Sequence, residues 1–224
     1  MLKNFVLFIL ILCSSLAQSQ ITPVPKDSTA VNDSIVKKAE FLKQLGNGFL
    51  PTKYINLDLR YLLKFNQYEG LRTGLGGVTN ENFSKKYRIN SYIVYGFRDH
   101  TFKYSIGGGF RIAEKTNSWV NLSYTDDLQE TGSSAFLTDK RFFSFFEPRL
   151  LNIDLFHRHI TKAVSLEHQF AKNVLSETQF AISNINPTYN YAYTVNGNTF
   201  SEFHLSTAKI ALQWSPFSDF EITK

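Results

Sequence analysis

Apolar and polar residues alternate along much of the chain, most clearly over residues 101–112. One set of alternate positions in this stretch is Phe102, Tyr104, Ile106, Gly108, Phe110 and Ile112. The positions between them are Lys103, Ser105, Gly107, Gly109 and Arg111. Successive side chains of a β-strand point to opposite faces, so this pattern predicts a strand with one apolar and one polar face.

Seven other segments show a similar alternation and are separated by polar turns. In addition to 101–112, we predict strands over residues 54–63, 69–78, 87–97, 118–125, 159–170, 175–186 and 200–214. In the last segment, Phe203 and Leu205 are out of phase with Ile210 and Trp214. This change of phase predicts a β-bulge near residues 207–208.

The faces opposite the apolar stripes carry charge of both signs. The charged residues on these faces are Asp58, Arg60, Arg72, Arg88, Lys103, Arg111, Glu167, Glu177, Glu202 and Lys209. Mixed charge indicates a narrow interior crossed by ion pairs. A Lys or Arg on a lipid-facing surface would cost about 2–4 kcal/mol near the bilayer midplane. We therefore expect these residues to face the lumen of a barrel and to have a structural role.

The N-terminus has the three parts of a secretory signal peptide. Lys3 supplies the positive charge, residues 5–12 the apolar segment, and Ser15-Leu16-Ala17 a small-residue cleavage site. The apolar segment is too short to cross a bilayer as a helix. A lipoprotein signal is the alternative, because Cys13 follows an apolar run. Leu12 argues against it, because a lipid-attachment site has small residues at that position.

An exported chain with amphipathic strands favours the cell outer membrane as its location. The predicted fold class is all-β: an antiparallel up-and-down transmembrane β-barrel of about eight strands, complete or part of a larger barrel. A short amphipathic helix is expected over residues 33–45. The expected organisation is a signal peptide (1–17), a leader with a periplasmic helix (18–50), the barrel (51–217) and a tail (218–224). If the first strand runs outward, the two long connections, 126–158 and 187–199, are extracellular.

The composition narrows the possible functions. Cys13 is the single cysteine and lies in the predicted signal peptide, so the mature chain would have no disulfide or thiolate. The net charge of +5 is modest, and nucleic acid is not an expected partner of an exported protein. The aromatic fraction of 15% suits a barrel with aromatic residues at both membrane interfaces.

No residue is predicted to be catalytic or to bind a cofactor or metal. The glycine clusters 74–77 and 107–109 lack the strand–turn–helix context of a phosphate-binding loop and are expected to lie within strands. We interpret His157-Arg158-His159 as loop residues and Asp126-Asp127 as the start of the longest loop.

Two alternative functions remain open. A membrane-embedded enzyme acting on lipids would need a serine nucleophile, a histidine base and a third orienting group. The strand residues that qualify are Ser165, Ser206, His168 and His204. A soluble periplasmic β-barrel that binds an apolar ligand would need Phe102, Ile106 and Phe110 to point inward.

Phenylalanine is concentrated in the longest predicted loop, just before Pro148. The four residues are Phe142, Phe143, Phe145 and Phe146. One interpretation is an aromatic anchor at the membrane interface or a loop folded over the barrel mouth. The other is a docking patch for a partner protein or lipid. Replacing all four with serine distinguishes them, because only a docking patch predicts lost association with the barrel still folded.

Several motifs resemble a known family. They are Asn66-Gln67-Tyr68-Glu69-Gly70-Leu71-Arg72-Thr73-Gly74-Leu75-Gly76, Tyr95-Gly96-Phe97-Arg98-Asp99, Ser123-Tyr124-Thr125-Asp126-Asp127 and Leu212-Gln213-Trp214-Ser215-Pro216. Over residues 47–217 the chain resembles an outer-membrane β-barrel family of unknown function that usually follows a carboxypeptidase-regulatory-like domain. The resemblance implies a non-enzymatic structural or transport-associated role without a cofactor. The partners that it implies are outer-membrane lipid, the barrel-assembly machinery, and another barrel segment or a partner protein.

The chain departs from that family in two ways. The regulatory-like domain is missing, and the barrel of the family is considerably longer. One expectation is a minimal closed barrel, since eight strands enclose an interior that side chains can fill. The other, which we favour, is a shortened version of a larger barrel, whose edge strands need a partner in lipid.

Overall fold

The computed structural model describes residues 28–133, 153 and 155–214. The predicted signal peptide and the four phenylalanines Phe142, Phe143, Phe145 and Phe146 lie outside these ranges. The chain divides into two compact units, residues 1–40 and 41–224. Helix α2 (Ser28–Gly46) crosses the boundary between them and begins five residues before the predicted start at residue 33. Among the described residues, no helix has both the length and the apolar character needed to span a bilayer.

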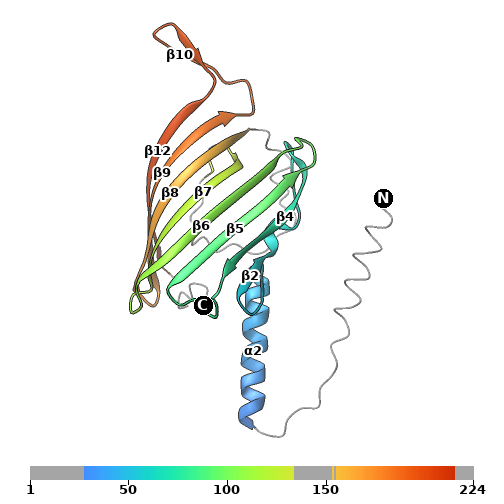
Figure 1. Ribbon diagram of the computed structural model, residues 1–224, viewed down its shortest axis with the longest axis vertical. Coiled ribbons are helices and arrows are strands. Elements are labelled where there is room, and N and C mark those ends of the chain that lie inside the picture. Colours follow the sequence, from blue (N-terminus) through green and yellow to red (C-terminus); the bar gives the residue numbers. More distant parts are fainter. Residues whose placement is uncertain (1–27, 134–152, 154, 215–224) are drawn as a thin grey trace, which may run out of the picture. The chain divides into compact units, whose positions relative to one another are not determined.

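The described strands form an antiparallel sheet of ten strands in up-and-down order (Figure 1). Its seven long members are β4 (Gly70–Thr79), β5 (Tyr87–Gly96), β6 (Phe102–Ala113), β7 (Ser118–Glu130), β8 (Phe156–Ala171), β9 (Val174–Pro187) and β12 (Phe203–Trp214). Three short strands lie beside β4: β1 (Phe49–Pro51), β2 (Ile55–Asp58) and β3 (Lys64–Asn66). A separate hairpin, β10 (Tyr193–Val195) and β11 (Asn198–Phe200), lies between β9 and β12 in the chain. The predicted all-β antiparallel architecture is confirmed.

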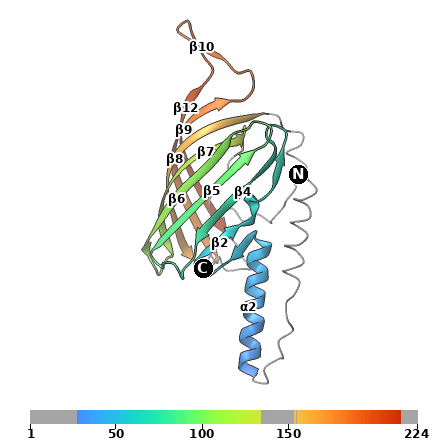
Figure 2. The same cartoon turned by 45° about the vertical axis from the view of Figure 1, so that its right-hand side comes forward.

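The sheet is strongly twisted and curled, but it is not closed (Figure 2). Its strand order is β1-β2-β4-β5-β6-β7-β8-β9-β12. Among the described strands, β12 pairs only with β9, and β1 pairs only with β2. The described strands therefore form an open sheet with two edges and not a minimal closed barrel.

The predicted first strand, 54–63, is wrong in its second half. Strand β2 ends at Asp58, and a 3-10 helix, η1 (Leu59–Tyr61), follows. Asp58 ends the strand because its carboxylate accepts a hydrogen bond from the Arg60 backbone N–H at 3.1 Å and forms an ion pair with the Arg60 side chain. The alternation of Leu57, Leu59 and Tyr61 imitated a strand across this turn.

The long interruption predicted between residues 125 and 159 is shorter than expected. Strand β7 continues to Glu130, and β8 already begins at Phe156. Asp126 and Asp127 therefore lie within β7, and 157–159 lies within β8, so their assignment to a loop was wrong. The alternation is hidden there because polar residues predominate on both faces, with Leu128 and Phe156 as the apolar exceptions.

The predicted bulge near residues 207–208 is absent from the described strand. The register between β9 and β12 is continuous from Phe203 to Trp214. Phe203 and Leu205 are out of phase with Ile210 because they lie on the opposite face of the sheet. On that face the ring of Phe203 lies beside Tyr191, with 5.8 Å between ring centroids.

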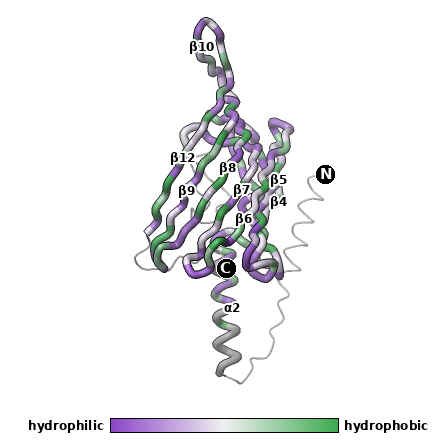
Figure 3. Tube along the Cα trace, turned by 60° about the vertical axis from the view of Figure 1, so that its left-hand side comes forward, coloured by the Kyte–Doolittle hydropathy of each residue, from purple (hydrophilic) through white to green (hydrophobic). Residues whose placement is uncertain are grey.

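The burial of apolar and polar side chains on the two faces of the sheet is the reverse of the usual pattern in a soluble protein. On the outer face, large apolar side chains are exposed, including Phe102, Ile106, Leu122 and Phe180, and Ile210 is 80% exposed. On the inner face, polar side chains are buried, including Ser105, Asn121, Ser165, Glu167 and Glu177, and Lys103 is only 1% exposed. Figure 3 shows the resulting alternation of hydrophobic and hydrophilic positions along the strands.

Candidate functional site

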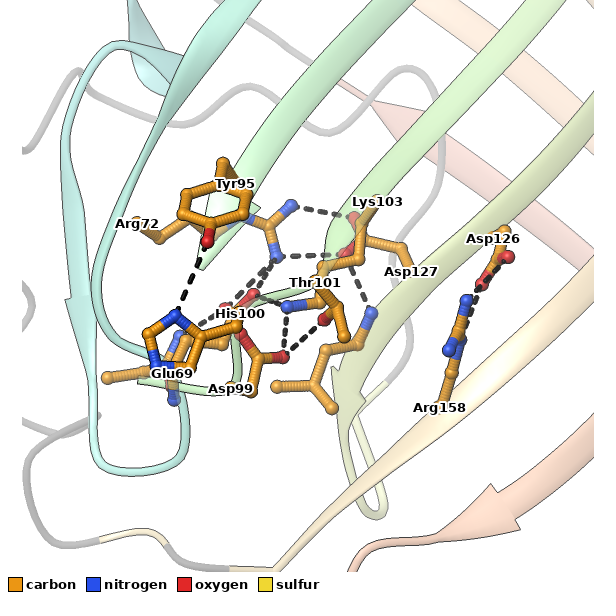
Figure 4. A network of polar contacts seen from close by, with 12 residues as sticks. Glu69, Arg72, Tyr95, Asp99, His100, Thr101, Lys103, Asp126, Asp127 and Arg158 are labelled. Carbon is orange, nitrogen blue, oxygen red and sulfur yellow. Dashed lines mark hydrogen bonds and ion pairs between the residues drawn. The ribbon is translucent and has the colours of Figure 1, made fainter. Parts of the chain in front are cut away.

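The buried polar side chains of the inner face form two networks. The first, the upper network, lies at the end of the sheet that carries the β5–β6 turn (Figure 4). It contains Glu69, Arg72, Tyr92, Asp99, Lys103 and Asp127, which come from four strands and two turns. Alternation places Arg72 on the inner face of β4, Lys103 on that of β6 and Asp127 on that of β7.

Arg72 and Asp127 form the central pair of the upper network. The Arg72 guanidinium donates two parallel hydrogen bonds to Asp127, with both N–O distances 2.8 Å. Tyr92 donates a third hydrogen bond to this carboxylate at 2.6 Å. Strands β4 and β7 are separated in the sheet by β5 and β6, so the pair spans the curl of the sheet. A bidentate pair of this kind also fixes the orientation of both side chains.

Lys103 joins the turns at the same end. Its Nζ lies 2.6 Å from Glu69 Oε1 and also contacts Asp99 Oδ2. Glu69 in turn lies 3.2 Å from Arg72 Nη1, so the contacts are continuous. With two cations and three carboxylates, the upper network carries a formal charge of −1. Each of these charges contacts a group of opposite charge within the protein, which a buried ion requires.

Asp99 lies in the β5–β6 turn, outside the strands. Burial raises the pKa of its carboxyl, but hydrogen bonds from Lys103 and Thr101 outweigh burial and hold the pKa below its usual value. The Thr101 hydroxyl donates at 2.6 Å. Asp99 is therefore held as a carboxylate that ties the turn to β6.

The second network, the lower network, lies nearer the other end of the inner face. It contains Arg88, Arg111, Trp119, Asn121 and Glu167. Arg88 Nη2 lies 2.6 Å from Glu167 Oε1 and 2.7 Å from Asn121 Oδ1. The guanidiniums of Arg88 and Arg111 lie over the Trp119 ring, 4.7 Å and 4.9 Å from its centroid. The Arg88–Glu167 pair joins β5 to β8, so it also spans two intervening strands.

An aromatic ring from η1 stacks on the Tyr92 ring of the upper network. The ring of Tyr61, in η1, stacks on Tyr92 with 4.2 Å between centroids. Gly76 makes this possible, because a Cβ at that position would lie 2.4 Å from the Tyr61 ring. Both glycine clusters lie within strands, β4 and β6, as predicted.

The structure brings five of the ten predicted charged residues into these contacts. Arg72 and Lys103 lie in the upper network, while Arg88, Arg111 and Glu167 lie in the lower one. Glu177 is 1% exposed, and it lies opposite Glu167 in the register between β8 and β9. The remaining predicted residues are the ion-paired Asp58 and Arg60, Lys209 on the inner face of β12, and the exposed Glu202 just before that strand.

Four members of the upper network were not among the predicted charged residues: Glu69, Tyr92, Asp99 and Asp127. Two of them carried a local signal. Glu69 precedes Arg72 by three residues and Asp99 precedes Lys103 by four, and each forms an ion pair with that residue. The Asp127 pairing had no local signal, because its partner Arg72 is 55 residues away in the chain.

The serine and histidine candidates do not contact one another as a lipid-acting enzyme would need. His168 Nδ1 lies 2.7 Å from the Ser118 hydroxyl, and its ring contacts Phe170. His204 Nδ1 contacts the side-chain oxygen of Asn184. Ser165 Oγ accepts a hydrogen bond from Asn121 Nδ2 at 3.3 Å.

The histidines His157 and His159 lie in β8, with 6.1 Å between ring centroids. Their Nδ1 atoms contact the hydroxyls of Thr131 and Thr161, respectively. In the described ranges, no three His, Cys, Asp or Glu residues gather in a way that could hold a metal ion. The polar side chains described on the inner face contact one another, and oppositely charged groups among them form ion pairs.

No protein-family model, no curated protein and no solved structure matches this chain.

Proposed function

We propose that this chain is an outer-membrane β-barrel protein with a non-enzymatic structural or transport-associated role, and that the described sheet is part of the barrel wall. The observation that carries the proposal is the inverted burial of the two faces. Large apolar side chains are exposed on one face, whereas ion pairs are buried on the other. Exposed apolar surface of this extent favours lipid as its surroundings.

The lengths of the strands support this proposal. The seven long strands have 10 to 16 residues, and a tilted strand needs roughly 9–11 to cross a bilayer. Strand β8, with 16 residues, would extend beyond the bilayer. Its upper part carries Arg158, which is ion-paired with Asp126 at 2.8 Å.

The positions of the outer-face residues define an apolar band across the sheet. The strand register arranges these residues in rows, each of which is a set of directly paired residues. On β5 the band runs from Tyr95 to Tyr87. On β12 it runs from Ala208 to Trp214, below the polar residues His204 and Ser206.

The band slopes across the sheet. From β5 to β12 its upper limit moves by three rows and its lower limit by two, over five strand spacings. With about 6.7 Å per row and about 4.8 Å between strands, the slope corresponds to a strand tilt of about 30–40°. Transmembrane barrel strands are tilted by about 35–45°. The agreement supports a membrane crossing the sheet along this band.

Aromatic side chains lie near both limits of the band. At the upper limit, Tyr95 lies beside Phe102, with 4.8 Å between centroids. At the lower limit, Tyr87 lies beside Phe110, at 5.5 Å. Aromatic residues at both interfaces are typical of transmembrane barrels. On this reading Phe102, Ile106 and Phe110 contact lipid, whereas a soluble barrel with an apolar ligand would need them to face inward.

The proposed role is structural or transport-associated because the inner face is occupied by the protein's own ion pairs. Resemblance to the outer-membrane barrel family remains part of the proposal, as do its partners: lipid, the barrel-assembly machinery, and a further barrel segment or partner protein. The edge at β12 is where such a segment would pair, because an unpaired strand is costly in lipid.

Membrane fractionation tests the proposal. The full chain is produced in a Gram-negative host, and its outer-membrane fraction is analysed by gel mobility with and without boiling. We expect a detergent-dependent outer-membrane band that shifts on heating. Soluble protein with no heat shift would contradict the proposal. Phospholipid hydrolysis that is lost on His168→Ala or His204→Ala would instead support the lipid-acting enzyme.

A further inference from the structure

An apolar groove crosses the middle of the outer face from β5 to β12, with a volume of about 1080 Å³. The aliphatic and phenylalanine side chains lining it include Ile89, Ile106, Leu122, Val164, Phe180 and Ile182. Gly108 also lines it, in the same row as Ile89 and Leu122, and the missing side chain there deepens the groove. The groove lies on the face that we propose to contact lipid, so the inference below rests on the proposed function.

One cation lies at the rim of this groove. Lys162 in β8 is exposed on the apolar face, between its paired neighbours Tyr124 in β7 and Ile182 in β9. One row higher, Asp126 is neutralised by Arg158. Among the described residues, Lys162 forms no ion pair. Its ammonium group therefore offers a positive charge beside an apolar channel.

The direction of the groove fits an acyl chain below a headgroup. Lys162 lies at the upper limit of the band, because in the next row up Ile160 on β8 lies between Asp126 on β7 and Asn184 on β9. On β5 the upper limit of the band is at Tyr95, and Ile89 lies three rows below it. The groove therefore descends from the membrane interface at Lys162 into the apolar band at Ile89.

We propose that this groove binds one acyl chain of a lipid with a phosphate headgroup, and that Lys162 holds the phosphate. The phosphate complements the ammonium charge, and one basic side chain at the membrane surface contributes enough to favour an anionic lipid. The apolar side chains of the groove contact the acyl chain. Close contact without a gap gives favourable van der Waals energy.

Native mass spectrometry of the full chain in detergent tests the proposal. The protein is incubated with phosphatidylglycerol or with diacylglycerol of the same acyl chains, which lacks the phosphate. We expect the wild type to retain phosphatidylglycerol in preference. Lys162→Gln should weaken phosphatidylglycerol binding about fivefold and leave diacylglycerol binding unchanged. Lys172→Gln is the matched control, because Lys172 lies in the exposed β8–β9 turn, away from the groove.

A second variant tests the groove itself. A Cβ at position 108 would meet its nearest atom, a backbone oxygen of Arg88, at 3.8 Å, so Gly108→Leu fits without a clash at Cβ. Its side chain would occupy the groove and should weaken binding of both lipids. Gly108→Ala is the control, since one methyl group leaves most of the space.

The outcomes separate this inference from the proposed function. If Lys162→Gln and Gly108→Leu both bind phosphatidylglycerol as the wild type does, while the outer-membrane band still shifts on heating, only the lipid groove is overturned. If the wild-type band is soluble and does not shift, the membrane location fails, and the groove fails with it.

Discussion

At the scale of single residues, the inner face depends on ions that are buried together. Lys103 is the clearest case, because its ammonium group lies between the carboxylates of Glu69 and Asp99 and is almost without contact with water. Removing one partner of such a group leaves the other charges uncompensated, which costs more than the intact pair contributes.

We expect Lys103→Met to destabilise the protein by about 3–5 kcal/mol, because Asp99 would lose its cation and Glu69 would keep only Arg72. Urea unfolding of the detergent-solubilised protein, followed by the heat-dependent gel shift, measures this change. Adding Glu69→Gln should recover part of the loss. Lys172→Met, in the exposed turn, should have little effect, and an equal loss there would contradict the argument.

The lowered pKa of Asp99 predicts that the protein loses stability at acidic pH. Its pKa is held below the usual value in the folded chain, so the unfolded chain takes up the proton at higher pH. The stability that it contributes is complete above the ordinary carboxyl pKa, about 4, and is lost as the pH falls through the lowered folded value. Unfolding free energies of the wild type and Asp99→Asn between pH 7 and pH 3 should therefore converge as the pH falls. Parallel curves would show that Asp99 does not contribute.

A side chain at Gly76 should have a steric effect, and the same substitution at Gly108 is the control. Gly76→Ala would push its methyl group into the Tyr61 ring and disturb the Tyr61–Tyr92 stack, at a cost of about 1–3 kcal/mol. Gly108→Ala, on the outer face, should change stability far less. Urea unfolding of the two variants compares them, and equal losses would mean that strand glycines matter for backbone freedom and not for space.

At the scale of elements, the slope of the apolar band makes a prediction within a single row. Ile106 on β6 and Ser206 on β12 belong to the same row of the outer face, yet the slope places Ile106 inside the band and Ser206 above it. On the proposed membrane location, an arginine should therefore destabilise the protein more at position 106 than at position 206.

We expect Ile106→Arg to destabilise the membrane-inserted protein by about 2–4 kcal/mol and Ser206→Arg by about 0–1 kcal/mol. Unfolding from lipid vesicles, with the heat-dependent gel shift as the readout, measures both. Equal losses would mean that the band does not slope as the register indicates.

The elements were predictable from the sequence wherever one face is apolar and the other polar. The seven long strands meet this condition, and the alternation locates each of them within a few residues. The prediction failed at Asp58, where a local side-chain hydrogen bond turned an alternating segment into a 3-10 helix. It failed again at Asp126 and Asp127, where polar residues predominate on both faces. The pairing partners of Arg72 and Arg88 were not predictable, because each pair spans two intervening strands and depends on how tightly the sheet curls.

At the scale of the whole molecule, the long edge strand needs a partner. Strand β12 pairs with β9 over 12 residues, and in the described part of the chain its other side has no partner strand. In lipid such an edge leaves backbone groups without hydrogen bonds. We infer that β12 acquires a pairing strand when the protein is in the membrane.

Hydrogen exchange tests this inference. In the outer membrane, the amides of β12 should be protected as fully as those of β7, which is paired on both sides. In the refolded chain without lipid, β12 should exchange at alternate residues, because only one side is bonded. Exchange at alternate residues of β12 in the membrane as well would mean that the edge stays open there.

The two edges of the sheet differ in how readily they can pair with a further strand. Seven antiparallel pairings separate β2 from β12, so these two strands run in opposite directions, whereas β1 runs parallel to β12. Strand β1 has three residues and ends in Pro51, which has no N–H to donate. Further strands can therefore be added more readily at β12, and because β1 runs parallel to β12, a ring that closes on β1 with antiparallel pairing must gain an odd number of strands. The smallest addition that would join the two edges with antiparallel pairing throughout is accordingly one strand.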